Sequence, residues 1–163
     1  MNGSVSARLR PSVYNGWKIS LVRDRTPQLI GALFRIWEDS VKATHLFLNA
    51  EEIAAIARYV PQALQNVQDL AVAEDENNAV AAFLGVEGKK IEMLFVTPER
   101  RGRGIGRALI EFAVDVYDAD EVTVNVQNPQ AVAFYGHMGF ECVRRSDTDE
   151  QGNAYPILYM RRK

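Results

Sequence analysis

The segment Arg101–Gly106 constrains the fold more than any other part of this 163-residue sequence. It reads Arg-Gly-Arg-Gly-Ile-Gly and follows an apolar run at about Lys90–Val96 that is typical of a β-strand. Apolar residues at helical spacing come after it, from Ile105 to Val116. Closely spaced glycines let the backbone adopt unusual dihedral angles and approach a ligand. The sequence therefore predicts a strand, a glycine-rich turn and a helix that begins at the turn.

This turn has the chemistry of a phosphate-binding site. Free backbone amides and the dipole at a helix N-terminus favour anions. Four arginines lie nearby, namely Arg100, Arg101, Arg103 and Arg107. The spacing differs from that of a P-loop, which needs Lys-Ser/Thr after its second glycine, and from that of a dinucleotide fingerprint. The remaining alternative is an ordinary glycine turn with solvated arginines.

The rest of the sequence predicts an α+β chain. Short turn signals between three consecutive strands favour antiparallel pairing, because parallel strands need long crossovers. Cap residues followed by proline or glutamate indicate helix starts, and we expect Pro61 to end or bend the second helix. The further strands are expected at about Trp17–Val22, Asp69–Glu74, Ala79–Val86, Glu121–Gln127, Phe140–Arg144 and Tyr155–Met160, and the further helices at Pro27–Lys42, after Asn49, and from Pro129 to Gly139.

Composition excludes several classes of protein. Apolar residues make up 47% and charged residues 25%, so we expect one domain over residues 17–163 after a flexible leader at residues 1–16. The net charge of −2 argues against general nucleic-acid binding. The single cysteine, Cys142, cannot form an internal disulfide. No run approaches the roughly 20 apolar residues of a membrane span, so we expect a cytoplasmic protein without membrane contact.

Two motifs resemble the GNAT superfamily of acyl-CoA-dependent N-acetyltransferases. Arg101–Gly106 matches that family's Gln/Arg-x-x-Gly-x-Gly/Ala loop, and Leu94–Val96 with Pro98 looks like its fourth strand. The second motif is Asn128-x-x-Ala131-x-x-Phe134-Tyr135-x-x-x-Gly139-Phe140. Within the superfamily the chain looks like a group of small, uncharacterised bacterial acetyltransferases. The resemblance implies an α+β fold with a mixed, mostly antiparallel central sheet of about six to seven strands, flanked by about four helices.

The resemblance also implies that acetyl-CoA is the co-substrate. No cluster of histidine, cysteine and aspartate in the sequence suggests a metal, so we expect none. In the family, the pyrophosphate lies on the loop amides, the pantetheine arm pairs with the fourth strand, and a side chain at the position of Asn128 contacts the cofactor. Asn128 has an alternative, structural role as the cap before Pro129. The expected cofactor-binding residues are Leu94, Phe95, Val96, Arg101, Gly102, Arg103, Gly104, Ile105, Gly106, Arg107 and Asn128.

The same resemblance implies catalytic roles. Tyr135 matches the general acid that protonates the departing CoA thiolate, and a phenol with a pKa near 10 stays protonated at neutral pH. Glu92 shares a strand face with Leu94, which makes it the candidate base for the acceptor amine. We expect His45 and Tyr155 to shape the acceptor pocket, and His45 is the second candidate for the proton. Each residue also has a purely structural alternative. Tyr135 would be a buried aromatic, Glu92 an exposed carboxylate on a strand, and His45 a hydrogen-bonded loop histidine.

The predicted function is therefore transfer of an acetyl group from acetyl-CoA to a primary amine, by direct attack in a ternary complex. The acceptor is a small-molecule amine or an amine of a peptide or protein. The sequence is also compatible with a homodimer. The alternative is a non-catalytic sensor of acyl-CoA with the same fold. A sensor has no need of the acid that Tyr135 supplies, which favours the enzyme.

Overall fold

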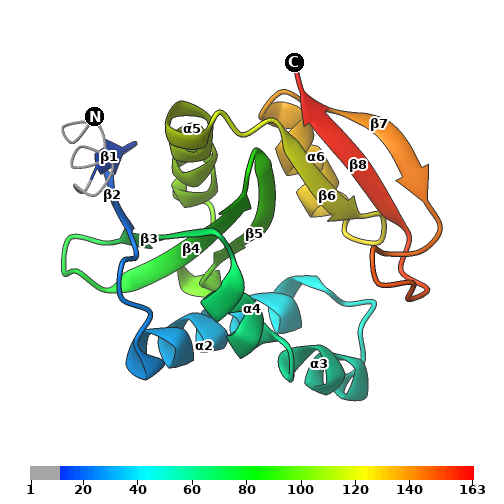
Figure 1. Cartoon of the computed structure of the whole chain (residues 1–163), viewed down its shortest axis with the longest axis horizontal. Helices are drawn as coiled ribbons and strands as arrows, with labels where there is room; N and C mark the ends of the chain where they lie inside the picture. The colour runs from blue at the N-terminus through cyan, green and yellow to red at the C-terminus, as the bar shows by residue number, and fades with distance from the viewer. Residues whose placement is uncertain (1–11) are drawn as a thin grey trace.

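Eight strands form one mixed sheet in the computed structural model, which describes residues 12–163. The sheet order is β1-β2-β3-β4-β5-β6-β8-β7 (Figure 1). All neighbouring strands are antiparallel except β5 and β6. The predicted α+β fold with a mostly antiparallel sheet is confirmed, with eight strands in place of six to seven. The strands are β1 Ser12–Tyr14, β2 Trp17–Leu21, β3 Asp69–Glu74, β4 Val80–Glu87, β5 Lys90–Val96, β6 Glu121–Asn125, β7 Phe140–Ser146 and β8 Ile157–Arg162.

The additional strand, β1, lies within the segment predicted as a leader. It pairs with β2 through a turn at Asn15 and Gly16, whose φ angles of 51° and 84° are both positive. Asn-Gly is the preferred dipeptide for a two-residue hairpin turn, because both residues tolerate positive φ. Tyr14 fixes the hairpin to the helix behind it through a 3.0 Å hydrogen bond to Asp115. The leader is thus structured from residue 12 onward, and residues 1–11 lie outside the described part of the chain.

Five α-helices and one short 3-10 helix accompany the sheet in the described residues. The second predicted helix is in fact two, because Pro61 lies in the first turn of α4 and begins that helix instead of ending the previous one. None of the helices in residues 12–163 is long and apolar enough to cross a bilayer. The helices are α2 Pro27–Thr44, α3 Ala50–Ala57, α4 Val60–Asn66, η1 Pro98–Arg100, α5 Ile105–Tyr117 and α6 Pro129–His137.

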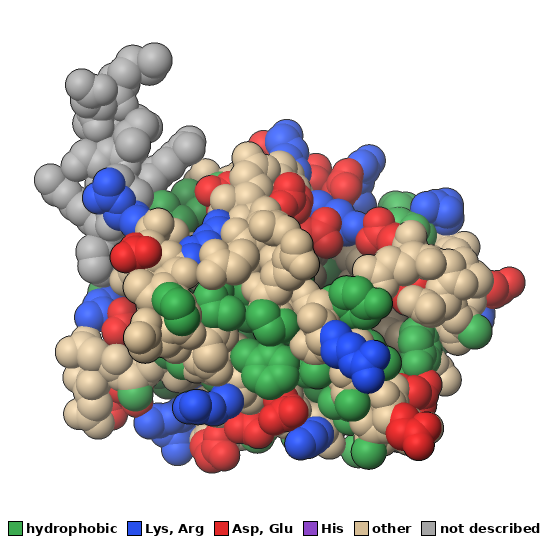
Figure 2. Space-filling view, turned by 60° about the horizontal axis from the view of Figure 1, so that its bottom comes forward, with side chains coloured by type: hydrophobic (Ala, Val, Ile, Leu, Met, Phe, Trp, Pro, Cys, Tyr) green, Lys and Arg blue, Asp and Glu red, His purple; other side chains and the backbone are tan. Residues whose placement is uncertain are grey.

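Two apolar clusters cover opposite faces of the sheet. On β3, Ala71 and Ala73 pack with α5, whereas the alternate residues Leu70 and Val72 pack with α2 and α4. Helices α2, α3 and α4 form the lower face in Figure 1. Figure 2 looks onto this side, where hydrophobic side chains gather at the centre and charged side chains of both signs surround them. This face therefore has no broad patch of a single charge.

The strands β5 and β6 diverge soon after they begin. Their parallel pairing is confined to Lys90 with Glu121 and Ile91 with Val122, whereas β5 pairs with β4 along its whole length. From Glu92 to Val96, no strand among residues 12–163 therefore pairs with β5 on its β6 side. This opening in the sheet positions the site described next.

Candidate active site

The glycine-rich loop lies between η1 and α5 as predicted. Gly104 has φ +82° and caps the N-terminus of α5 in the left-handed conformation. Gly106 has a different reason to be glycine, because a Cβ atom there would lie 3.1 Å from the ring of Phe134. The loop thus permits close contact between α5 and α6. The first residues of α5, whose backbone amides have no acceptor within the helix, line one cavity.

Two contacts from residues distant in sequence hold this loop and its start in place. Arg100 makes a 2.7 Å salt bridge with the buried Asp75, and the indole of Trp17 donates a 3.0 Å hydrogen bond to the carbonyl of Arg103. The backbone N–H groups of Ala79 and Asn77, aided by Arg100, hold the pKa of Asp75 below its usual value. The loop is therefore preorganised by the fold.

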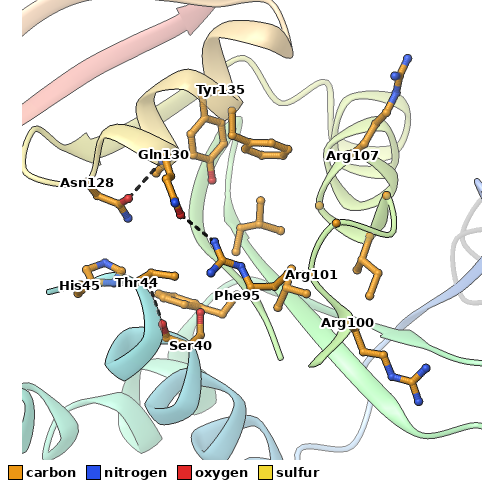
Figure 3. A pocket seen from close by; sticks show the side chains of 18 residues that line it. Ser40, Thr44, His45, Phe95, Arg100, Arg101, Arg107, Asn128, Gln130 and Tyr135 are labelled. Atoms are coloured by element: carbon orange, nitrogen blue, oxygen red, sulfur yellow. Dashed lines mark hydrogen bonds between the residues drawn. The ribbon is translucent and has the colours of Figure 1, made fainter. Parts of the chain in front are cut away.

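The loop arginines differ in their availability. Arg100 is engaged by Asp75, and Arg107 forms a 3.0 Å salt bridge with Glu111. Figure 3 shows the guanidinium groups of Arg100 and Arg107 pointing away from the cavity, whereas Arg101 reaches across it. Arg101 donates a 3.2 Å hydrogen bond to Gln130 at the start of α6. Arg101 is therefore the arginine best oriented toward a ligand in the cavity.

A cavity of about 340 Å³ opens beside the loop. Four segments that are distant in sequence meet around it: the glycine-rich loop, the free end of β5, the start of α6 and the C-terminal end of α2 (Figure 3). Nearly all the predicted cofactor residues line it. They are Leu94, Phe95, Val96, Arg101, Gly102, Gly104, Ile105, Gly106, Arg107 and Asn128, while Arg103 of the predicted set is outside the lining.

A second cavity of about 130 Å³ lies between the diverging strands β5 and β6. It is bordered by Ile91–Phe95 on one strand and Val122–Asn125 on the other. Six residues line both cavities, so the two adjoin: His45, Leu94, Phe95, Asn128, Ala131 and Tyr135. A ligand in the larger cavity can therefore meet a ligand in the smaller one at this shared wall.

Tyr135 is a buried residue of α6 at the shared wall. The rings of Phe134 and Phe140 pack edge-on against it, with centroids 5.1 and 5.6 Å away. Its hydroxyl points into the larger cavity (Figure 3). Burial raises the pKa of Tyr135 well above its usual value, because the phenolate would lose hydration. The hydroxyl is therefore a protonated donor at all physiological pH values.

Asn128 has the structural role that the sequence allowed, as the cap of α6, and it also lies at the shared wall. Its side-chain oxygen accepts a 3.2 Å hydrogen bond from the backbone N–H of Ala131, which caps α6. The residue is buried and lines both cavities. Its amide NH₂ group remains available to donate hydrogen bonds to a ligand.

Glu92 borders only the smaller cavity. Lys90 approaches its carboxylate at 3.6 Å and also binds Glu150 at 2.6 Å. Burial raises the pKa of Glu92, and the charge of Lys90 opposes this shift. The carboxylate thus lies beside the smaller cavity, away from the glycine-rich loop.

His45 follows the last residue of α2 and lines both cavities. Its Nδ1 atom lies 2.8 Å from the hydroxyl of Thr44, and burial lowers its pKa. Sequence reasoning did not select Ser40 and Thr44, which line the larger cavity beside it. The sequence feature that could have indicated them is a pair of hydroxyl residues four positions apart, at the end of a helix with an apolar stripe.

Tyr155 lies in the β7–β8 connection and lines neither cavity. Its hydroxyl donates a hydrogen bond to Glu52 of α3, which lowers the pKa of that carboxyl. Its ring contacts Phe47, with centroids 6.3 Å apart, and Phe47 in turn contacts His45 at 5.4 Å. Tyr155 therefore reaches the site through one intervening aromatic side chain.

Comparisons with known proteins agree with this geometry. A family model described as an acetyltransferase (GNAT) domain matches residues 38–155. The chain is 39% identical over 130 residues to the peptidyl-lysine N-acetyltransferase YjaB of Escherichia coli (strain K12). The matched region covers 77% of this chain and 85% of YjaB. It is 27% identical over 132 residues to the peptidyl-lysine N-acetyltransferase YiaC of the same strain. That matched region covers 80% of this chain and 89% of YiaC.

A solved structure supports the same relationship. The solution structure of apo-form YjaB from Escherichia coli has a TM-score of 0.78 with this chain at 37% identity, covering 88% of this chain and 96% of that one. GNAT acetyltransferases use acetyl-CoA as their co-substrate, and the glycine-rich loop beside the open end of β5 is in keeping with that chemistry. This chain is therefore a member of the GNAT family of N-acetyltransferases.

Proposed function

We propose that this protein transfers the acetyl group of acetyl-CoA to the side-chain amine of lysine in a peptide or protein. The observation that carries the proposal is the pair of adjoining cavities with Tyr135 in their shared wall. One cavity borders an anion-binding loop, and the other borders the carboxylate of Glu92. The names of YjaB and YiaC as peptidyl-lysine N-acetyltransferases support lysine as the acceptor.

The larger cavity suits the CoA part of the donor. The backbone amides at the N-terminus of α5 provide hydrogen-bond donors for the pyrophosphate, and Arg101 adds a positive charge. Because β5 has no partner strand beyond Ile91 on its β6 side, its backbone groups can pair with the amides of the pantetheine arm. This pairing directs the thioester toward the shared wall.

The chemistry at the shared wall follows from the groups gathered there. The lysine amine attacks the thioester carbon, and a backbone N–H of β5 stabilises the developing oxyanion. The carbon–sulfur bond then breaks, and the Tyr135 hydroxyl gives its proton to the sulfur. A base must also remove one proton from the acceptor ammonium, and the carboxylate of Glu92 attracts this cation toward the smaller cavity.

The test is an acetylation assay with a lysine-containing peptide. The protein is incubated with acetyl-CoA and the peptide, and mass spectrometry locates any acetyl group. The matched control peptide has arginine in place of lysine and a blocked N-terminus. We expect acetylation of the lysine peptide alone, together with release of one free CoA thiol for each transfer.

Two other outcomes would count against the proposal. Acetylation of a free N-terminus but not of lysine would make the acceptor a different amine. Tight binding of acetyl-CoA without transfer to any amine in a library would favour the alternative of a non-catalytic sensor.

A further inference from the structure

The hydroxyl of Thr44 determines the protonation pattern of its neighbour, His45. It lies 2.7 Å from the backbone carbonyl oxygen of Ser40 and 2.8 Å from Nδ1 of His45 (Figure 3). A hydroxyl has a single hydrogen, and a carbonyl oxygen can only accept. The Thr44 hydrogen is therefore donated to Ser40, so the Thr44 oxygen must accept from His45. Nδ1 of His45 consequently carries a hydrogen.

The charge state of the ring follows from its surroundings. Burial lowers the pKa of His45 below its usual value of 6.5, so the ring is neutral at pH 7. In a neutral ring with hydrogen on Nδ1, the Nε2 atom has a free lone pair. The charged and titratable groups that line the same two cavities are Glu92 on β5, Tyr135 on α6, Arg100 and Arg101 before α5 and Arg107 within it, while Tyr155 and Glu52 lie beyond Phe47.

We propose that Nε2 of His45 is the base that removes the proton from the acceptor ammonium. The geometry favours His45 over Glu92 because His45 lines both cavities and shares their common wall with Tyr135. Glu92 borders only the smaller cavity, where Lys90 holds its carboxylate. Its role in this account is to attract the ammonium. This inference rests on the proposed function and assigns the base for it.

The protons balance as follows. Nε2 takes one proton from the lysine ammonium, which leaves a neutral amine and an imidazolium. The amine attacks the thioester carbon, the carbon–sulfur bond breaks, and Tyr135 protonates the sulfur. The second proton of the attacking nitrogen restores the Tyr135 hydroxyl, and the imidazolium releases its proton to solvent. In this scheme Thr44 is a positioning residue, since it acts through the tautomer of His45.

The first experiment measures the tautomer directly in the full chain without substrate. Nitrogen-15 NMR distinguishes a ring with hydrogen on Nδ1 from one with hydrogen on Nε2, and His45→Gln assigns the signal. We expect the Nδ1–H form at pH 7, retention of that form in Thr44→Ser, and a mixture of tautomers in the near-isosteric Thr44→Val. An imidazolium or an Nε2–H ring in the wild type at pH 7 would overturn the proposal, whatever the acceptor.

The second experiment measures kcat/KM for acetylation of a lysine peptide between pH 5 and 9. The wild type should show an acidic limb below pH 6.5, where His45 becomes protonated. His45→Gln should remove this limb and lower kcat/KM by roughly 10²–10⁴. Thr44→Val should lower kcat/KM in proportion to the fraction of rings that NMR finds outside the Nδ1–H form, while Thr44→Ser keeps most of the activity.

The Glu92→Gln variant separates the two candidate bases. It should raise KM for the peptide and leave the acidic limb in place. Loss of the limb in Glu92→Gln, with the limb retained in His45→Gln, would assign the base to Glu92 and refute the proposal. Failure of the wild type to acetylate lysine would instead refute the proposed function, while the NMR result would still decide the tautomer.

Discussion

At the scale of single residues, the site depends on side chains whose protonation is set by burial. Tyr135 lies among Phe134 and Phe140, so its pKa is raised and its hydroxyl stays protonated. His45 is half-buried, so its pKa is lowered and its ring stays neutral. At the same pH, Tyr135 can therefore donate a proton and His45 can accept one. Acetyl transfer to an ammonium needs both a proton donor and a proton acceptor.

The Tyr135→Phe variant tests the donor. It keeps the aromatic contacts with Phe134 and Phe140 and removes only the hydroxyl. We expect turnover to fall by roughly 10²–10⁴, while the Kd for acetyl-CoA changes little because the ring still packs. Steady-state kinetics with a lysine peptide and calorimetric titration with acetyl-CoA measure the two quantities. Near wild-type turnover in the Phe variant would exclude Tyr135 as the acid.

At the scale of elements, local patterns predicted some features and could not predict others. The loop Arg101–Gly106 was predictable because its glycines serve a local turn and a helix start. The divergence of β5 and β6 was not, because it depends on where two distant strands cease to pair. Pro61 was misread because proline is equally compatible with a helix end and a first helical turn, and the choice depends on the packing of Val60 and Leu64.

The same limit applies to the candidate site. Tyr135, Asn128 and the loop follow from motifs with fixed spacing, and the structure brings them to one cavity. The hydrogen bonds of Thr44 have no such signature, because they depend on how the last turn of α2 ends. The strand β1 was missed because Asn15 and Gly16 lie within a polar segment that offers little periodicity, although Asn-Gly itself is a hairpin signal.

The contact between α5 and α6 can be tested with Gly106→Ala. The added Cβ would approach the Phe134 ring to 3.1 Å, so this ring must move by a few tenths of an ångström, next to Tyr135 on α6. We expect a loss of stability of about 1–3 kcal/mol and a lower kcat. The matched control is Gly31→Ala in α2, where a Cβ would meet nothing within 4 Å, and which should raise stability by about 0.4–1 kcal/mol. Urea unfolding measures both, and equal effects would contradict the packing argument.

At the scale of the whole molecule, the fold couples stability to pH. His45 has a lowered pKa, so between that value and 6.5 the unfolded chain binds more protons than the folded one. Stability should therefore fall as pH decreases from 7 toward 5. In His45→Gln this decrease should be smaller, as measured by the free energy of unfolding in urea at several pH values. If the free energy of unfolding of His45→Gln depended on pH as steeply as that of the wild type, the fold would not be lowering the pKa of His45.

Ligand binding should also stabilise the whole molecule. At a concentration one hundred times its Kd, CoA is expected to raise the free energy of unfolding by about 2.7 kcal/mol. ATP should give a much smaller increase, because it lacks the pantetheine arm that pairs with β5. The Gly104→Glu variant should abolish the CoA effect, since it introduces a negative charge at the N-terminus of α5. Thermal unfolding with each ligand measures this, and equal shifts with CoA and ATP would contradict the assignment.

The central claim is that donor and acceptor occupy two adjoining cavities and react at their shared wall. The most direct test is a crystal structure with a bisubstrate compound in which the nitrogen of a lysine side chain is joined to the sulfur of CoA through an acetyl group. We predict the pyrophosphate on the amides at the start of α5, the lysine part beside Glu92, and the sulfur within about 3–3.5 Å of the Tyr135 hydroxyl. A compound bound with its lysine part outside the cavity between β5 and β6, or with its sulfur far from Tyr135, would contradict the account.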